Sequence, residues 1–121
     1  MVTYLVIFGL MSLLYVGLGL PLARRKVGRN SLYGLRVGET MASDEVWYEA
    51  NAICGRELVA FGWASLIVAV GLFPVPWPGI KIYPTILTVA HLVGVLVVAG
   101  RGMATAREIA ARVKAKQGTE P

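Results

Sequence analysis

The chain has 121 residues, of which 56% are hydrophobic and only 16% are charged, whereas soluble domains average roughly 45–50% apolar and about 25% charged residues. This composition excludes an ordinary soluble domain. The formal net charge of +5 would suggest nucleic acid binding in a soluble protein, but next to long apolar runs it is a topology signal, so we expect no nucleic acid partner.

The first predicted element is a membrane span at residues 2–22. Residues 1–23 carry no charged side chain, and a helix of this length matches the roughly 30 Å of bilayer hydrocarbon at about 1.5 Å per residue. A cleaved signal peptide is the alternative, but its basic residues would precede a shorter apolar run. Here Arg24, Arg25 and Lys26 follow the run, so we expect the span to be retained.

Two further spans are predicted at about residues 52–73 and 82–100. The apolar run of the second span is short, so we expect its helix to begin near Ser43, which is a good N-cap residue. Three prolines lie between the two spans and forbid helix continuation there, so they predict a helical hairpin. Lys81 is the only basic residue of this turn.

Basic residues are distributed unequally along the chain. Six lie in residues 23–57, one lies in the hairpin turn, and five follow Gly100. The positive-inside rule therefore places the N-terminus outside, and the loop 23–51 and the tail 101–121 in the cytoplasm. Residues 102–117 predict an amphipathic helix along the inner membrane surface, either as a docking helix for a partner or as an anchor to anionic lipid. The expected fold class is all-α: one integral membrane domain with three transmembrane helices and an ordered cytoplasmic loop.

Residues 30–55, which we call the motif segment, are not explained by hydrophobicity alone. Between Tyr33 and Arg36 stands a glycine that can adopt positive φ, a composition typical of a compact turn. Downstream, Trp47, Asn51 and Gly55 recur at every fourth residue and therefore share one face of a helix.

Read in order, the motif segment contains an Asn, Tyr-Gly-x-Arg, a Thr, an acidic pair, a Trp, an Asn four residues later and a Gly after four more. With the hydrophobic hairpin that follows, this pattern resembles the SdpI family, named for a bacterial membrane protein that gives immunity to a secreted killing peptide. The resemblance implies a three-span module of the bacterial plasma membrane that acts by binding, in immunity or in membrane signalling. The matching residues are Asn30, Tyr33, Gly34, Arg36, Thr40, Asp44, Glu45, Trp47, Asn51 and Gly55.

Two interpretations of the motif residues stay open. They bind a lipid head group, a toxin peptide or a regulator at the cytoplasmic face, or they hold the loop under the helices. Arginine suits both, because its planar group binds phosphate and also packs on Trp. A different class of function is also open, namely an accessory subunit packed against a larger membrane complex.

Catalysis is not expected from this sequence. No set of nucleophile, base and orienting acid appears, and no cluster of Cys, His and carboxylates has metal-ligand spacing. We therefore predict no enzyme activity, no cofactor and no metal. The expected partners are membrane lipid and a protein.

A few polar residues lie within or beside the predicted spans. His91, Ser12 and Ser65 fall near one depth, so we expect His91 to bond to Ser65, to Ser12 or to its own-helix neighbour Thr88, with a functional role as the alternative. At the cytoplasmic ends of spans two and three, Glu57 and Arg101 predict an interhelical ion pair.

Overall fold

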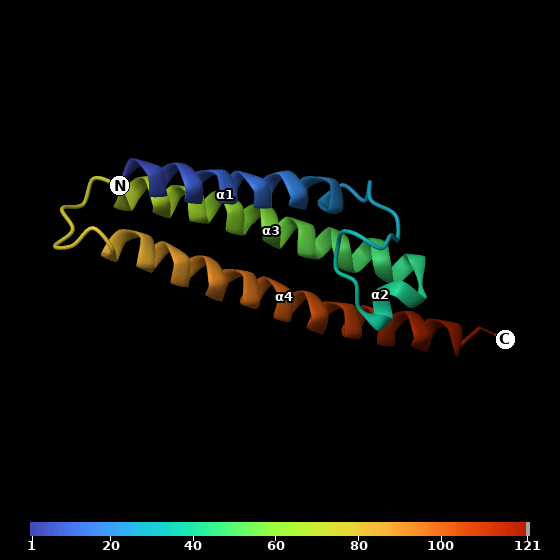
Figure 1. The fold of residues 1–121 in the computed structure, drawn as a ribbon. Coiled ribbons are helices and arrows are strands. Elements are labelled where there is room, and N and C mark those ends of the chain that lie inside the picture. The colour runs from blue at the N-terminus through green and yellow to red at the C-terminus, as the bar shows by residue number, and fades with distance from the viewer. Residues whose placement is uncertain (121) are drawn as a thin grey trace.

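The computed structural model describes residues 1–120 and contains four helices: α1 (Val2–Ala23), α2 (Gly38–Ala42), α3 (Asp44–Leu72) and α4 (Ile82–Gln117). Within residues 1–120 there is no strand. Helices α1, α3 and α4 run alongside one another (Figure 1), and each is long and apolar enough to cross a membrane. The prediction of three spans in an all-α fold is confirmed, and the chain is a multi-pass membrane protein.

Helix α1 packs on α3 through small residues. A Cβ atom at Gly19 would lie 2.7 Å from the carbonyl oxygen of Gly55, and one at Gly62 would lie 2.7 Å from the carbonyl oxygen of Ser12. Ser12 and Gly19 are seven residues apart in α1, as are Gly55 and Gly62 in α3. The two antiparallel helices therefore meet at successive levels, with backbones as close as small residues permit.

Helix α4 also packs on α3, and only weakly on α1. The ring of Phe61 in α3 lies against Gly94 of α4, so closely that a Cβ at this glycine would collide with it. Nearer the hairpin, the fully buried Tyr83 donates a hydrogen bond of 2.8 Å to the carbonyl oxygen of Ala69. Because α3 contacts both neighbours, it is the central element of the bundle.

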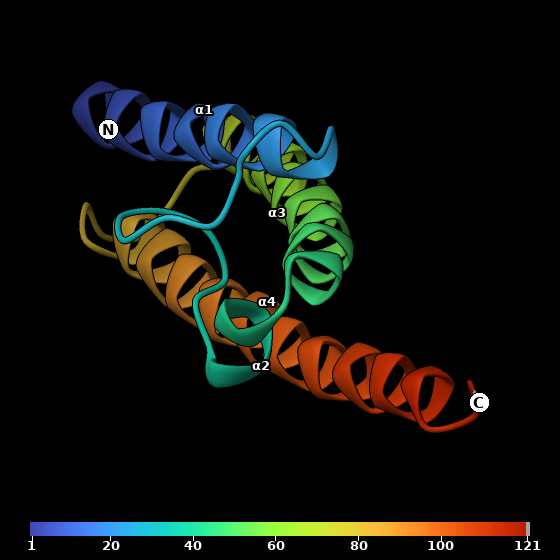
Figure 2. The same cartoon turned by 90° about the vertical axis from the view of Figure 1, so that its right-hand side faces the viewer.

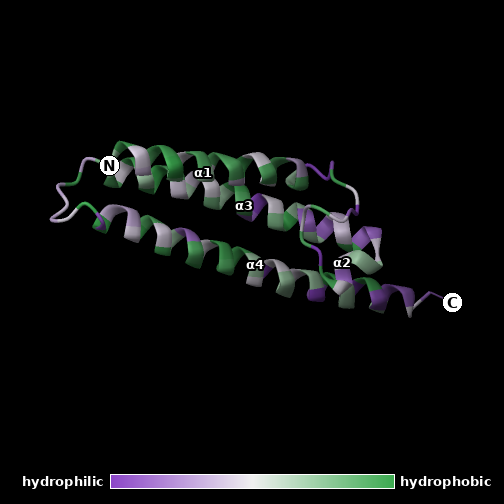
Figure 3. Cartoon of the chain, in the orientation of Figure 1, coloured by the Kyte–Doolittle hydropathy of each residue, from purple (hydrophilic) through white to green (hydrophobic). Residues whose placement is uncertain are grey.

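Hydrophilic residues gather at one end of the molecule, around α2 and the adjoining ends of α3 and α4 (Figure 3). At this end the structure differs from the expected tail, because residues 102–117 continue α4 without a break. They project beyond the span instead of turning along the membrane surface.

The continuous helix has a physical reason. No proline interrupts α4 after residue 84. In addition, the apolar face of residues 102–117 packs on the first turns of α3 and is therefore not left for lipid. Arg112 adds an ion pair of 3.1 Å with Glu49 of α3. The last residue of the expected tail, Pro121, lies outside the described residues. The apolar side chains that α3 and the tail bury against each other are Val46, Ala50, Ala106, Ile109 and Val113.

Candidate functional site

Residues 24–37 leave α1, cross the polar end of the bundle and return through α2 to α3 (Figure 2). The turn out of α1 uses Arg25 at φ 57°, a left-handed conformation that ends the helix. The backbone of this loop forms no sheet or long helix, so side chains have to satisfy its polar groups.

Asn30 closes the first turn of the loop. Its side-chain oxygen accepts hydrogen bonds from the backbone N–H of Leu32, at 2.9 Å, and of Tyr33, at 2.8 Å. Its side-chain nitrogen donates to the carbonyl oxygen of Gly28 at 2.8 Å. Asn30 thus replaces the backbone partners that a regular element would supply.

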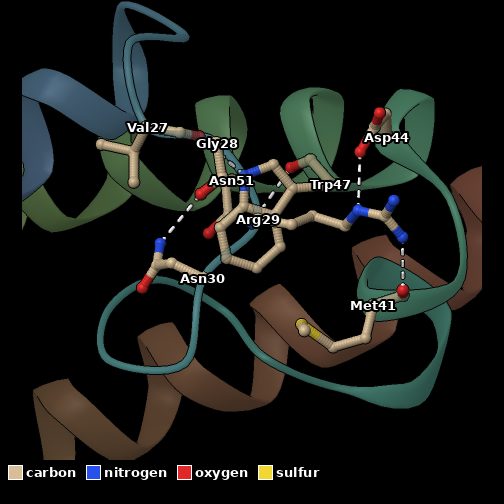
Figure 4. Close-up of polar contacts among 8 residues, drawn as sticks. All are labelled: Val27, Gly28, Arg29, Asn30, Met41, Asp44, Trp47 and Asn51. Carbon is tan, nitrogen blue, oxygen red and sulfur yellow. Dashed lines mark hydrogen bonds and ion pairs between the residues drawn. The ribbon is translucent and has the colours of Figure 1, made fainter.

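Trp47 and Asn51, one turn apart in α3, attach the loop to that helix (Figure 4). The Trp47 ring is fully buried, and its N–H donates to the carbonyl oxygen of Val27 at 2.7 Å. The side-chain oxygen of Asn51 accepts from the backbone N–H of Leu35 at 2.6 Å, and its nitrogen donates to the carbonyl oxygen of Trp47 at 3.0 Å. Both side chains bond to the protein's own backbone.

Gly34 fits between these two side chains. Its φ is +111°, and a Cβ there would lie 3.0 Å from Oδ1 of Asn51 and 3.0 Å from Cη2 of Trp47. Both the backbone conformation and the available space therefore require glycine at this position.

Thr40 and Tyr33 make two further attachments. The buried Thr40 hydroxyl accepts from the backbone N–H of Val37 at 3.0 Å and donates to the carbonyl oxygen of Leu35 at 2.7 Å. The Tyr33 hydroxyl donates to the carbonyl oxygen of Leu18 in α1. Burial raises the pKa of Tyr33 above its ordinary value, so the hydroxyl keeps its proton at neutral pH.

Arg29 is a contact residue that the sequence analysis did not single out. Its Nη1 donates to the carbonyl oxygen of Met41 at 2.6 Å, and its Nε lies 2.6 Å from Oδ1 of Asp44 (Figure 4). The sequence indicated only the acidic member of this pair, since Asp44 lies in the first turn of α3, where negative charge is favoured. Both side chains are partly exposed, so the pair stabilises the fold by no more than about 1 kcal/mol.

Arg36 is the only basic residue of the motif segment. Like the acidic Glu45, it is exposed, and it forms no hydrogen bond or ion pair with any other residue in the described range 1–120. Arg29, Arg101, Arg107 and Arg112, by contrast, each have a carboxylate partner. The guanidinium of Arg36 is therefore available to a partner outside the chain.

Glu57 and Arg101 lie together where α3 and α4 pass each other. The Nε and Nη2 atoms of Arg101 are each 2.9 Å from Oε1 of Glu57. Gly55, two residues earlier, contributes no polar contact, and its place in the motif is explained by the close approach of α1.

The three polar residues at mid-span do not bond to one another. Ser12 donates to the carbonyl oxygen of Phe8 at 2.8 Å, and Nδ1 of His91 lies 2.8 Å from the carbonyl oxygen of Leu87. The expected bond from His91 to Ser65, Ser12 or Thr88 is therefore wrong. Ser12 and His91 each pair instead with the backbone carbonyl one turn earlier in their own helix, as is common for hydroxyls in membrane helices.

No group of three or more His, Cys, Asp or Glu side chains in residues 1–120 is placed to hold a metal ion. The polar contacts of the motif segment consist of hydrogen bonds to backbone and of three ion pairs, which join Glu39, Asp44 and Glu49 to arginines outside the segment. This arrangement holds a loop in one shape and leaves one cation exposed.

Comparison with known proteins identifies a family. The model of the SdpI/YfhL protein family matches residues 26–103, which is about two thirds of the chain. Among curated proteins and solved structures, none matches. The matched region contains every residue of the motif segment and reaches past the Glu57–Arg101 pair, so the chain belongs to the SdpI/YfhL protein family.

Proposed function

We propose that this protein acts by binding, as an immunity protein that captures a membrane-active antibacterial peptide, and that Arg36 is the contact residue. Family membership supports a role in immunity or signalling. The observation that carries the proposal is the contrast within the motif: Asn30, Thr40, Trp47 and Asn51 bond to the chain itself, whereas Arg36 is exposed and unpaired within residues 1–120.

A cavity lined by the residues that precede Arg36 supports a ligand that is partly apolar. The three residues before it, Tyr33, Gly34 and Leu35, line an apolar cavity of about 230 Å³ together with Leu22 of α1 and other residues of α3 and α4. An arginine presents several N–H donors in a fixed plane and binds carboxylates by two parallel hydrogen bonds. The combination suits an apolar peptide segment that carries a carboxylate.

The distribution of charge supports a location for this site. Eleven of the twelve Lys and Arg residues lie between residues 24 and 56 or after residue 100, which favours the cytoplasmic side of the bacterial plasma membrane for this end of the bundle. The bound segment would then be the leading end of a peptide that has inserted across the bilayer. Anionic lipid is a second partner for the unpaired basic residues of the same end.

A challenge assay in a bacterial host tests the proposal. Cells that express the parent are expected to survive a membrane-active peptide, cells with Arg36→Ala to lose protection, and cells with Arg36→Lys to keep a part of it, because lysine keeps the charge but not the planar fork. Arg56→Ala is the matched control, because Arg56 is also exposed at the base of a span.

The interpretation of the assay requires equal amounts of inserted protein, measured by immunoblot of the membrane fraction. Should Arg36→Ala protect as well as the parent, the proposed contact is wrong. Should the parent protect against no peptide and copurify with one stable membrane complex, the protein is an accessory subunit instead.

A further inference from the structure

An apolar cavity of about 520 Å³ lies between α1 and α4, near the middle of both spans. It exists because these two helices each pack on α3 and diverge from one another. Its volume falls within the roughly 300–1,000 Å³ that is typical of small-molecule sites. No residue of the motif segment lines it, and it shares only Val95 with the smaller cavity of the site proposed above. Its walls include Phe8, Met11 and Tyr15 of α1 and His91, Leu92 and Leu96 of α4.

His91 gives this cavity a chemical preference. The side chain is 4% exposed, and its Nδ1 lies 2.8 Å from the carbonyl oxygen of Leu87. A carbonyl oxygen only accepts hydrogen bonds, so Nδ1 carries the proton, and in the neutral ring Nε2 is then an acceptor. Nε2 is the only buried side-chain nitrogen or oxygen within residues 1–120 that has no partner.

The surroundings of His91 favour a flat ligand. The ring centroids of Phe8, Tyr15 and Phe61 lie 5.1, 5.9 and 6.0 Å from that of His91. Aromatic rings at such distances pack in tilted or edge-to-face pairs. A ligand with a planar ring can join this cluster, whereas an acyl chain would gain only dispersion contacts and would leave Nε2 without a partner.

The depth of His91 narrows the choice of ligand. It lies nine residues into α4, about 14 Å along the helix from its start at about 1.5 Å per residue, and hence near the centre of roughly 30 Å of hydrocarbon. Phospholipid head groups reside at the membrane surface and place no hydrogen-bond donor there. A donor at this depth has to belong to a molecule that dissolves in the bilayer interior.

We propose that the cavity binds a membrane-dissolved molecule with a hydroxyl-bearing planar ring, the chemistry of an isoprenoid quinol, and that this hydroxyl donates to Nε2 of His91. The ring packs among the aromatic side chains, and the isoprenoid tail leaves between α1 and α4 toward lipid. Nε2 is itself buried under neighbouring atoms, so binding includes rotation of a neighbouring side chain.

Because His91 is the only histidine in the sequence, its ring nitrogens can be observed directly. The protein is labelled with ¹⁵N-histidine, reconstituted in nanodiscs, and titrated with a short-chain ubiquinol or with the corresponding quinone, which lacks the hydroxyl donor. The quinol is expected to shift the Nε2 resonance saturably. The quinone is expected to bind roughly tenfold more weakly, the effect of losing one hydrogen bond in an apolar site.

Two variants keep the test decisive. Because His91→Phe removes the observed nitrogen, ligand binding to the variants is measured by retention of quinol or quinone on protein-loaded against empty nanodiscs. His91→Phe is expected to remove the preference for quinol over quinone, and Leu96→Trp to block both by filling the cavity. Leu96 is 71% exposed, so its replacement leaves the core of the bundle intact. The proposal is overturned if quinol leaves the Nε2 resonance unchanged in the folded protein. It is equally overturned if dodecane shifts the resonance as much, or if the shift follows protein concentration alone, which would identify a second copy as the donor.

Discussion

Replacing Gly19 with alanine tests whether close backbone packing of α1 on α3 stabilises the bundle. A Cβ at this position would lie 2.7 Å from the carbonyl oxygen of Gly55 and 3.1 Å from the backbone nitrogen of Val59. Backbone atoms of a helix cannot rotate aside as a side chain can. At Gly17, two residues earlier in the same helix, a Cβ would meet nothing within 4 Å, so Gly17→Ala is the matched control.

The magnitude follows from the geometry. Ordinary van der Waals contact begins near 3.4 Å, so the two helices have to separate locally by about 0.7 Å. A gap of this size forfeits a quarter to a half of the attraction of each affected atom pair, and overpacking of this kind typically costs about 1–3 kcal/mol. Both substitutions gain the same helix propensity of about 0.5–1 kcal/mol. The two variants should therefore differ by about 1–3 kcal/mol in the free energy of unfolding.

Titration with SDS in mixed micelles, followed by the fluorescence of the three tryptophans, measures this difference. Gly17→Ala is expected to unfold at the same SDS fraction as the parent or a higher one, and Gly19→Ala at a lower one. Equal stability of the two variants would refute the packing argument, because it would mean that α1 and α3 are held together by lipid and loop alone.

Three other changes test separate contacts. Gly34→Ala is expected to lower the free energy of unfolding in the same titration by about 1–2 kcal/mol, because an L-residue is strained at positive φ, whereas Gly38→Ala, with open space around it, should not; equal effects would contradict this. Reversal of the pair, as Glu57→Arg with Arg101→Glu, should restore the loss of up to about 1 kcal/mol that either change causes alone, and a double variant no better than the singles would exclude the pairing. With the native cysteine replaced, a membrane-impermeant thiol reagent should label a cysteine at Gly79 in intact cells and not one at Gly38, and the reverse pattern would invert the proposed topology.

The spans could be predicted because three apolar runs and a turn with three prolines are visible in the sequence. The course of the tail could not. An amphipathic stripe shows only that one face of residues 102–117 is buried, and it does not distinguish a membrane surface from a protein surface. The missing information was the partner, Val46 and Ala50 on the first turns of α3, whose position follows from the tertiary fold.

The motif residues could be selected from the sequence, but their partners could not. Asn51 bonds to the backbone of Leu35, sixteen residues away, and only the folded loop brings the two together. Gly55 was predicted only to share a helix face with Trp47 and Asn51, although its spacing of seven from Gly62 matches that of Ser12 and Gly19 and already indicated a close helix contact. Such a repeat of small residues is visible in the sequence alone.

The central claim is that the motif segment holds its own loop in place and presents Arg36 to a peptide. Photocrosslinking tests it most directly. A photoreactive amino acid at position 36, and separately at position 56, is irradiated in intact cells exposed to the peptide against which the parent protects. We predict a crosslink to the peptide from position 36 and none from position 56. A crosslink to a resident membrane protein from position 36, without any to the peptide, would contradict the account.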